Sequence, residues 1–150
     1  MTTRINLGKA APQLYKSMEQ MEQQSVQLAL DAGLDKGFCH VLKLRASQIN
    51  GCAFCLRMHT RDALAAGESA DRLSVLPGWR ESRYFSELEA AALALIEAVT
   101  QVADGQVPDA VYQQAEAALS DAQIAAVQWL GVVINGWNRI AIGSRYPVAP

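Results

Sequence analysis

Long apolar runs are absent from this 150-residue sequence. No segment approaches the roughly 20 consecutive apolar residues that a membrane-spanning helix needs, and the first residues lack the apolar core of a signal peptide. We therefore expect no membrane association and a cytoplasmic protein with reduced thiols. Strong positive charge is absent too. The formal net charge is −2, whereas a nucleic-acid-binding domain normally has a basic surface, so we expect no nucleic-acid partner.

Alternating patterns and repeats are also missing. No stretch alternates polar and apolar residues for long enough to predict a strand, and no repeat, low-complexity run or linker divides the chain. Apolar residues instead recur at intervals of three and four, and capping residues and glycines separate these segments. The sequence therefore predicts an all-α fold with a single domain, residues 1–150, of about six or seven helices.

The expected helices follow from caps and apolar stripes. Pro12 suits the first turn of a long helix, and Gly33 suits its C-terminal end. Asp35 and Ser86 are N-cap residues, and a glutamate three positions after Ser86 completes a capping box. Residues 1–10 are expected to be extended, and residues 77–84 to form a turn and a loop. The predicted helices cover residues 12–32, 36–49, 52–66, 70–76, 87–100 and 109–119, and a last helix starts near 121.

Two helices have apolar faces that a second subunit could cover. The last helix is apolar on nearly every side between Ile124 and Ile134, with Trp129 among its members. A helix of this kind is buried in the core or lies in an oligomer interface. The first long helix has a narrower stripe, which could pack on the core or on another subunit. Its members are Leu14, Met18, Met21, Ser25 and Leu28.

Cysteine and histidine are scarce, with three and two residues, and most of them gather in one short stretch. Cys55 and His59 are four positions apart, so they lie one turn from each other on the same helix face. Cys52 lies at the start of this helix, where free N–H groups and the helix dipole stabilise a thiolate. A lowered thiol pKa makes a cysteine nucleophilic at neutral pH. In a reduced compartment, a C-x-x-C pair is more often redox-active or metal-binding than a structural disulfide.

This pattern predicts a reactive dithiol with an imidazole within reach. One thiolate would attack the O–O bond of a peroxide and become a sulfenic acid, and the second thiol would condense with it to a disulfide. His59 can transfer the protons near pH 7. We assign Cys55 as the attacking thiol because His59 follows it by one turn. The spacing does not exclude the opposite order, in which Cys52 attacks.

The segment from Leu44 to Ala63 resembles the signature of the alkylhydroperoxidase D-like (AhpD-like) proteins of the carboxymuconolactone decarboxylase superfamily. A looser similarity extends to residues 86–93 and 135–140. The resemblance implies an all-helical fold, assembly into homo-oligomers (commonly trimers or hexamers), and a thiol-dependent peroxidase that acts through the two cysteines and the histidine of this motif. The implied partners are a hydroperoxide substrate and a disulfide-reducing protein or small thiol. No metal or organic cofactor is implied, and the decarboxylase branch lacks this cysteine pair.

One position departs from the family pattern. The proton relay of the family usually includes a glutamate twelve residues before the first cysteine, where this chain has His40. A histidine can still pass a proton near neutral pH, but it lacks the negative charge of a carboxylate. We therefore expect either a relay rebuilt around His40, as a fourth catalytic residue, or weak peroxidase activity.

Two other functions fit the same residues. Cys52, Cys55, His59 and His40 (or Cys39) supply four acceptable zinc ligands, which would indicate a structural or regulatory zinc protein. However, their spacing on one helix is not a common zinc-finger spacing. A helical oligomer whose dithiol only senses oxidation is the third possibility. Outside a zinc site, Cys39 is expected to pack as a small apolar side chain.

Overall fold

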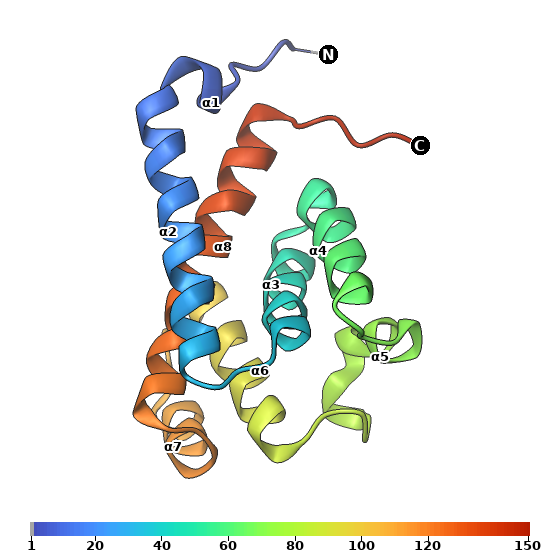
Figure 1. Ribbon diagram of the computed structural model, residues 1–150, viewed down its shortest axis with the longest axis vertical. Helices are drawn as coiled ribbons and strands as arrows, with labels where there is room; N and C mark the ends of the chain where they lie inside the picture. Colours follow the sequence, from blue (N-terminus) through green and yellow to red (C-terminus); the bar gives the residue numbers. More distant parts are fainter. Residues whose placement is uncertain (1) are drawn as a thin grey trace.

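The protein is helical along most of its length in the computed structural model, which describes residues 2–150. Figure 1 shows the helices, with the two ends of the chain at the same end of the molecule. No strand occurs in residues 2–150, so the predicted all-α fold is confirmed. The elements are α1 (Leu7–Ala10), α2 (Pro12–Asp31), α3 (Lys36–Asn50), α4 (Ala53–Ala65), α5 (Ala70–Ser74), the 3-10 helix η1 (Leu76–Glu81), α6 (Glu87–Thr100), α7 (Asp109–Ala118) and α8 (Asp121–Ser144).

Two short elements differ from the sequence-based prediction. The lead-in, predicted to be extended over residues 1–10, contains the helix α1, and Met1 lies outside the described residues. The side chain of Asn6 caps α1 by accepting the N–H of Lys9 at 2.9 Å. The predicted turn after Leu76 is a 3-10 helix with Pro77 near its start. Each segment has a helix-start residue, the capping Asn6 in one and Pro77 in the other, but it is too short for an apolar stripe.

Local capping sets the boundaries of the longer helices. Asp35 Oδ1 accepts the N–H groups of Gly37 and Phe38 at 2.8 and 3.2 Å, and it thereby satisfies two free donors at the start of α3. Ser86 and Glu89 form the predicted capping box at the start of α6. At the end of α3, Gly51 adopts a left-handed conformation with φ of 67°, which a glycine tolerates well.

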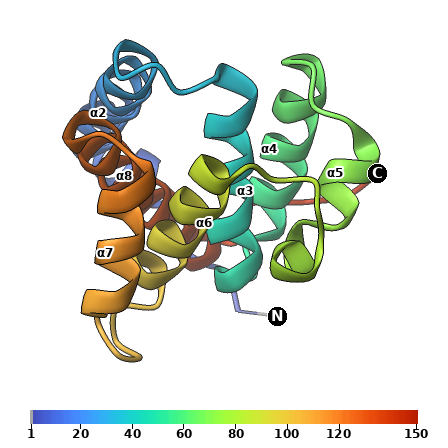
Figure 2. The same cartoon turned by 90° about the horizontal axis from the view of Figure 1, so that it is seen from below.

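The helices pack around one core (Figures 1 and 2). The antiparallel pair α2 and α8 packs side by side, α3 packs against α4 and α8, and α6 packs against α3, α7 and α8. Fully buried aliphatic side chains from α3, α6 and α8 form the centre of this core, and each contributes about 1.5–3 kcal/mol by its burial. They include Leu42, Leu93, Ile96, Leu130 and Ile134. No helix of residues 2–150 meets the length and hydropathy needed to cross a bilayer.

A buried polar network holds α3, α6 and α8 in register. Asn138 is fully buried and donates to Ser47 Oγ at 3.0 Å, and it accepts a hydrogen bond from Asn50 Nδ2 at 2.8 Å. Asn50 Nδ2 also donates to Asn135 Oδ1, and the Asn135 amide donates to Thr100 Oγ1 at 3.0 Å. Buried polar groups that satisfy one another favour a single arrangement of the elements that carry them. The network therefore fixes the end of α3, from which the chain turns into α4.

Candidate active site

The two cysteines of the motif lie where α3 turns into α4. Cys52 is the N-cap residue of α4, and its sulfur accepts the backbone N–H of Cys55 at 3.4 Å. Both cysteines are free thiols, and their Sγ atoms are 2.7 Å apart. A disulfide has an S–S length of about 2.05 Å, so the two sulfurs need to approach by only about 0.7 Å to bond. The structure thus brings these two predicted site residues together.

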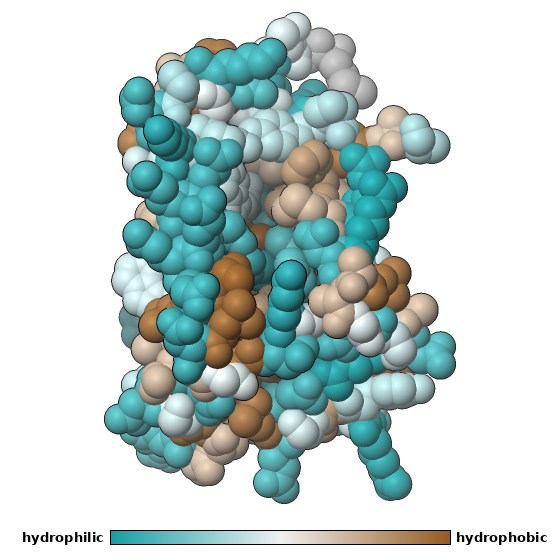
Figure 3. All heavy atoms as spheres, in the orientation of Figure 1, coloured by the Kyte–Doolittle hydropathy of each residue, from teal (hydrophilic) through white to brown (hydrophobic). Residues whose placement is uncertain are grey.

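Cys55 and His59 line one cavity, which lies between α2, α4 and α8 and has a volume of about 380 Å³. Figure 3 shows a hollow in the molecular surface, with the hydrophilic ridge of α2 on one side and α4 on the other. Aromatic and acidic side chains share the walls, so the cavity combines apolar surface with charge. The wall residues include Tyr15, Phe54, Trp137, Tyr146, Glu19, Glu22 and His40.

Cys52 faces a different space from Cys55. It lines a smaller recess of about 220 Å³ under the last residues of the chain, which cross the start of α4. Tyr146 packs edge to face on Phe54, with ring centroids 5.1 Å apart, and Arg57 Nη1 donates to the carbonyl oxygen of Ala149 at 2.8 Å. Of the two cysteines, only Cys55 borders the larger of these two cavities.

Both thiols of the pair are buried. Cys52 and Cys55 are 1% and 2% exposed. Burial raises the pKa of the Cys55 thiol to about 12, and a hydrogen bond with Cys52 adds to this, while a hydrogen bond from Asn138 opposes it. The thiolate expected from the sequence was at Cys52, the first residue of the helix, whereas Cys55 lies in the first turn of α4. At Cys55 the loss of hydration outweighs the helix terminus, so the resting thiol is protonated at neutral pH.

The two histidines meet at the cavity wall. His40 Nδ1 and His59 Nδ1 are 3.5 Å apart, with ring centroids 5.7 Å apart. Burial lowers the pKa of His59 to about 3, and the charge of Lys43 and the neighbouring His40 lower it further. Burial and Lys43 also lower the pKa of His40. Both imidazoles are therefore neutral at pH 7, and each offers one nitrogen as donor and one as acceptor.

An ion pair that the sequence did not predict borders the same cavity. Lys43 is 1% exposed and pairs with Glu22 of α2. A lysine between Leu42 and Leu44 was the sequence signal, because a charged residue in an apolar stretch is rarely buried without a partner. Glu22 lies one turn after Met18, beside the apolar stripe of α2. A pairing between these two helices could not be read from either helix alone.

The predicted zinc ligand set is not assembled. In residues 2–150, the one cluster with three or more candidate ligand atoms close together consists of His40, His59 and Asp62, and neither thiol belongs to it. Cys39 is buried in the main core, where burial raises its pKa to about 11, as expected for a packing residue. A zinc site made from the cysteines and both histidines is therefore not supported.

Acidification should destabilise the protein through His59. Its pKa is about 3 in the folded protein and 6.5 without these surroundings, so between these values the unfolded chain binds one more proton. The free energy of unfolding from this group therefore falls by about 1.4 kcal/mol for each pH unit as the pH drops through this window. Urea unfolding of the parent and His59→Asn between pH 7 and pH 4 measures the effect. Carboxylates add a slope of the same sign to both proteins, so a slope equal in the two would contradict the buried neutral imidazole.

Three comparisons with known proteins identify relatives of this chain. Residues 12–98 match the model of the carboxymuconolactone decarboxylase family. The uncharacterised protein YdfG of Bacillus subtilis is 35% identical over 142 residues, which cover 95% of this chain and 94% of the relative. A crystal structure from Agrobacterium tumefaciens is 40% identical with a TM-score of 0.87, and the match covers 99% of this chain and 100% of the other. That protein has an unknown function and a suggested role as the antioxidant defence protein AhpD. The chain therefore belongs to the carboxymuconolactone decarboxylase family and has the AhpD-like fold.

Proposed function

We propose that this protein is a thiol-dependent peroxidase that reduces hydroperoxides through a disulfide between Cys52 and Cys55. The observation that supports this most strongly is the pair of free thiols 2.7 Å apart, one of which borders a cavity that also holds two imidazoles. The antioxidant role suggested for the Agrobacterium tumefaciens protein agrees with this proposal. In the proposed reaction, Cys55 attacks and Cys52 resolves, because only Cys55 lines the larger cavity.

The proposed reaction needs no bound cofactor. The sulfur of Cys55 attacks one oxygen of the hydroperoxide, the O–O bond breaks, and the alkoxide that leaves takes up a proton to become an alcohol. The Cys55 sulfenic acid then reacts with the Cys52 thiol, which forms the disulfide and releases water. The dithiol has given two electrons to the peroxide. A small thiol or a reducing protein returns two electrons and two protons to restore both thiols.

Proton transfer is assigned to the histidines. The Cys55 thiol and the His59 ring are both neutral in the resting site, because burial disfavours the charged form of each. His59 is therefore proposed to accept the thiol proton as the sulfur attacks, rather than to hold a thiolate beforehand. His40 lies 3.5 Å from His59, so it can pass the proton onward at the position where the family usually has a glutamate. Because no thiolate is stored, the reaction should be faster at alkaline pH.

The cavity favours a small hydroperoxide with an apolar organic group. Its volume of about 380 Å³ lies at the lower end of the usual range for small-molecule sites. Phe54, Met58, Trp137 and Tyr146 supply apolar contact around Cys55. Hydrogen peroxide would leave this surface uncovered, whereas an alkyl or aryl hydroperoxide would bury its carbon atoms there.

Oxidation by peroxide should consume two of the three thiols. Thiols are titrated before and after one equivalent of an organic hydroperoxide, and the peptides are read by mass spectrometry. We expect a disulfide between Cys52 and Cys55, with Cys39 still reduced in the core. Sustained peroxide consumption with added dithiothreitol separates a peroxidase from an oxidation sensor, which would react only once. Unchanged Cys52 and Cys55, or a disulfide that includes Cys39, would contradict the proposed dithiol cycle.

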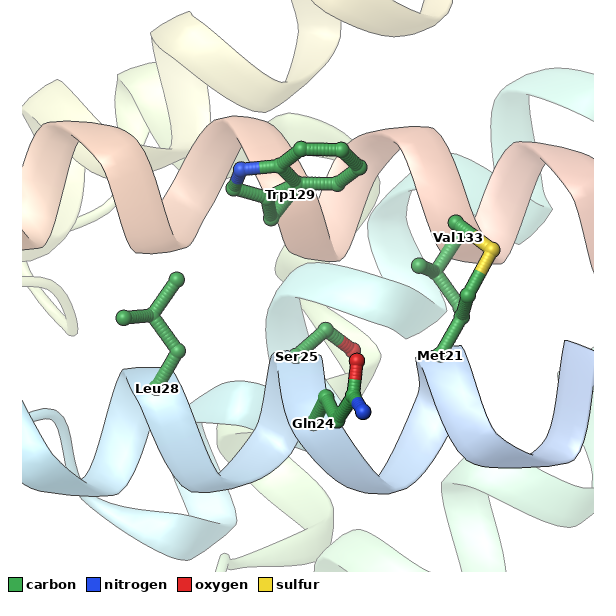
Figure 4. Close-up of a pocket in the computed structure, with 6 residues that line it drawn as sticks. All are labelled: Met21, Gln24, Ser25, Leu28, Trp129 and Val133. Carbon is green, nitrogen blue, oxygen red and sulfur yellow. The ribbon is translucent and has the colours of Figure 1, made fainter. Parts of the chain in front are cut away.

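We further propose that copies of this chain assemble in the cytoplasm into a homo-oligomer through α2 and α8. The apolar part of α8 is not wholly buried: Trp129 is 49% exposed and Val132 is 50% exposed. Figure 4 shows Trp129 and Val133 of α8 across a groove from Met21, Ser25 and Leu28 of α2. Of the two readings of this helix, burial in the core is thus wrong for this face, and a subunit interface is the proposal that fits it.

A further inference from the structure

The two histidines and one aspartate bring three metal-ligating side chains into a cluster beside the thiols. Each of His40, His59 and Asp62 offers one ligand atom, and these atoms all lie within 4.8 Å of one another. His59 and Asp62 are three positions apart on α4 and so share a face, and His40 meets them from α3. We propose that His40, His59 and Asp62 form a binding site for a divalent transition-metal ion such as Zn²⁺, separate from the two cysteines.

The spacing of the ring nitrogens fits a shared ion. Zinc binds imidazole nitrogen at about 2.0–2.1 Å, so two nitrogens at tetrahedral positions lie about 3.4 Å apart. The Nδ1 atoms of His40 and His59 are 3.5 Å apart. Asp62 supplies the carboxylate, and rotation of its side chain can bring an oxygen to the same ion. Two imidazoles and one carboxylate are ligands that suit zinc and other divalent transition metals.

The charges around the cluster allow a cation to bind there. Both rings border the cavity, so an ion between them would be reached from the open side of the site. Lys43 is the opposing charge, but it is paired with Glu22. Glu19 and Asp62 also line the cavity, so two further carboxylates remain beside the rings after Glu22 is paired with Lys43.

The proposed ion and the peroxide chemistry require the same imidazole. Three protein ligands leave a fourth position open toward the cavity, where water would complete the coordination. An ion bound to His59 occupies a nitrogen of the ring that should accept the thiol proton. Bound Zn²⁺ should therefore inhibit peroxide reduction reversibly, and a chelator should restore it. This consequence rests on the proposed peroxidase function, whereas the metal site itself does not.

Cobalt binding to the full-length Cys52→Ser/Cys55→Ser protein tests the site, because this protein has no dithiol to bind the ion. After metal is removed with a chelator, Co²⁺ is added and the visible absorption is recorded. We expect one ion per chain, intense ligand-field bands of a low-symmetry site, and no sulfur-to-cobalt charge-transfer band. Zn²⁺ should displace the Co²⁺ and raise the melting temperature, since a ligand that binds the folded state stabilises it.

Two ligand variants and one matched control complete this test. In the same double-serine background, His40→Gln and Asp62→Asn should each weaken Co²⁺ binding by at least about tenfold. Asp104→Asn, at an exposed turn, should leave binding unchanged. Absence of stoichiometric binding in the double-serine protein, or equal affinity in all three variants, would overturn the proposal. Peroxide turnover of the metal-free parent is measured separately, so failure of the metal site and failure of the peroxidase proposal are distinguishable.

Discussion

Replacing Cys55 with serine should lower the rate of hydroperoxide reduction by at least about a thousandfold, as is usual when a catalytic nucleophile is removed. A serine hydroxyl cannot form the sulfenic acid that the second thiol must attack. The structure supports this choice because Cys55 lines the cavity of about 380 Å³ and Cys52 lines the recess beneath the end of the chain. The measurement is steady-state consumption of an organic hydroperoxide with dithiothreitol as the reductant.

The other two cysteines supply the controls for this experiment. Cys39→Ser removes a thiol of the main core and should retain turnover in the fraction that folds. Cys52→Ser should still react once with peroxide, and the Cys55 sulfenic acid should then accumulate and be trapped by a sulfenic-acid reagent. An inactive Cys52→Ser together with a Cys55→Ser that still reacts once would reverse the assigned roles. Full turnover in both variants would remove the dithiol from the mechanism.

Replacing Glu22 with glutamine should lower the free energy of unfolding by about 3–5 kcal/mol. The substitution leaves the Lys43 ammonium, which is 1% exposed, without its charged partner. Removal of one member of a buried ion pair is costly because the remaining charge stays out of water without compensation. Urea unfolding at pH 7, followed by circular dichroism, measures the change.

Glu19 offers a matched control for this substitution. It lies one turn earlier on α2 and is exposed, so Glu19→Gln should change the free energy of unfolding by no more than about 0.5 kcal/mol. The double variant Glu22→Gln/Lys43→Met removes both charges and should regain most of the lost stability, since a well-packed apolar replacement of a buried pair is often neutral. Equal effects of Glu19→Gln and Glu22→Gln would show that the buried pair does not stabilise the fold.

The local parts of this molecule could be predicted from the sequence. The all-helical fold and most helix limits follow from caps and apolar spacing, which act within one or two turns. The closeness of Cys52 to Cys55 is local in the same sense, because both residues lie in the first turn of α4. The resemblance to AhpD-like proteins is confirmed by the family model and by the Agrobacterium tumefaciens structure.

The environment of the site could not be predicted in the same way. The contact between His40 and His59 depends on how α3 packs against α4, and the pair of Lys43 with Glu22 depends on how α2 packs against α3. The raised pKa of the Cys55 thiol arises from burial in the packed structure, and the position of Cys55 in the first turn of α4 does not indicate it. These properties belong to the packed structure, because no single segment of the sequence contains both partners.

The crossing of the last residues over the start of α4 has a consequence for regeneration of the oxidised protein. Tyr146 on Phe54 and the bond from Arg57 to Ala149 leave Cys52 under the chain end. An incoming thiolate that enters through the open cavity would meet the Cys55 sulfur, and the mixed disulfide would form there. Cys52 would then be the leaving group, and its sulfur would keep the backbone N–H of Cys55, at 3.4 Å, as a hydrogen-bond donor. The chain end would in this way fix the direction in which the disulfide opens.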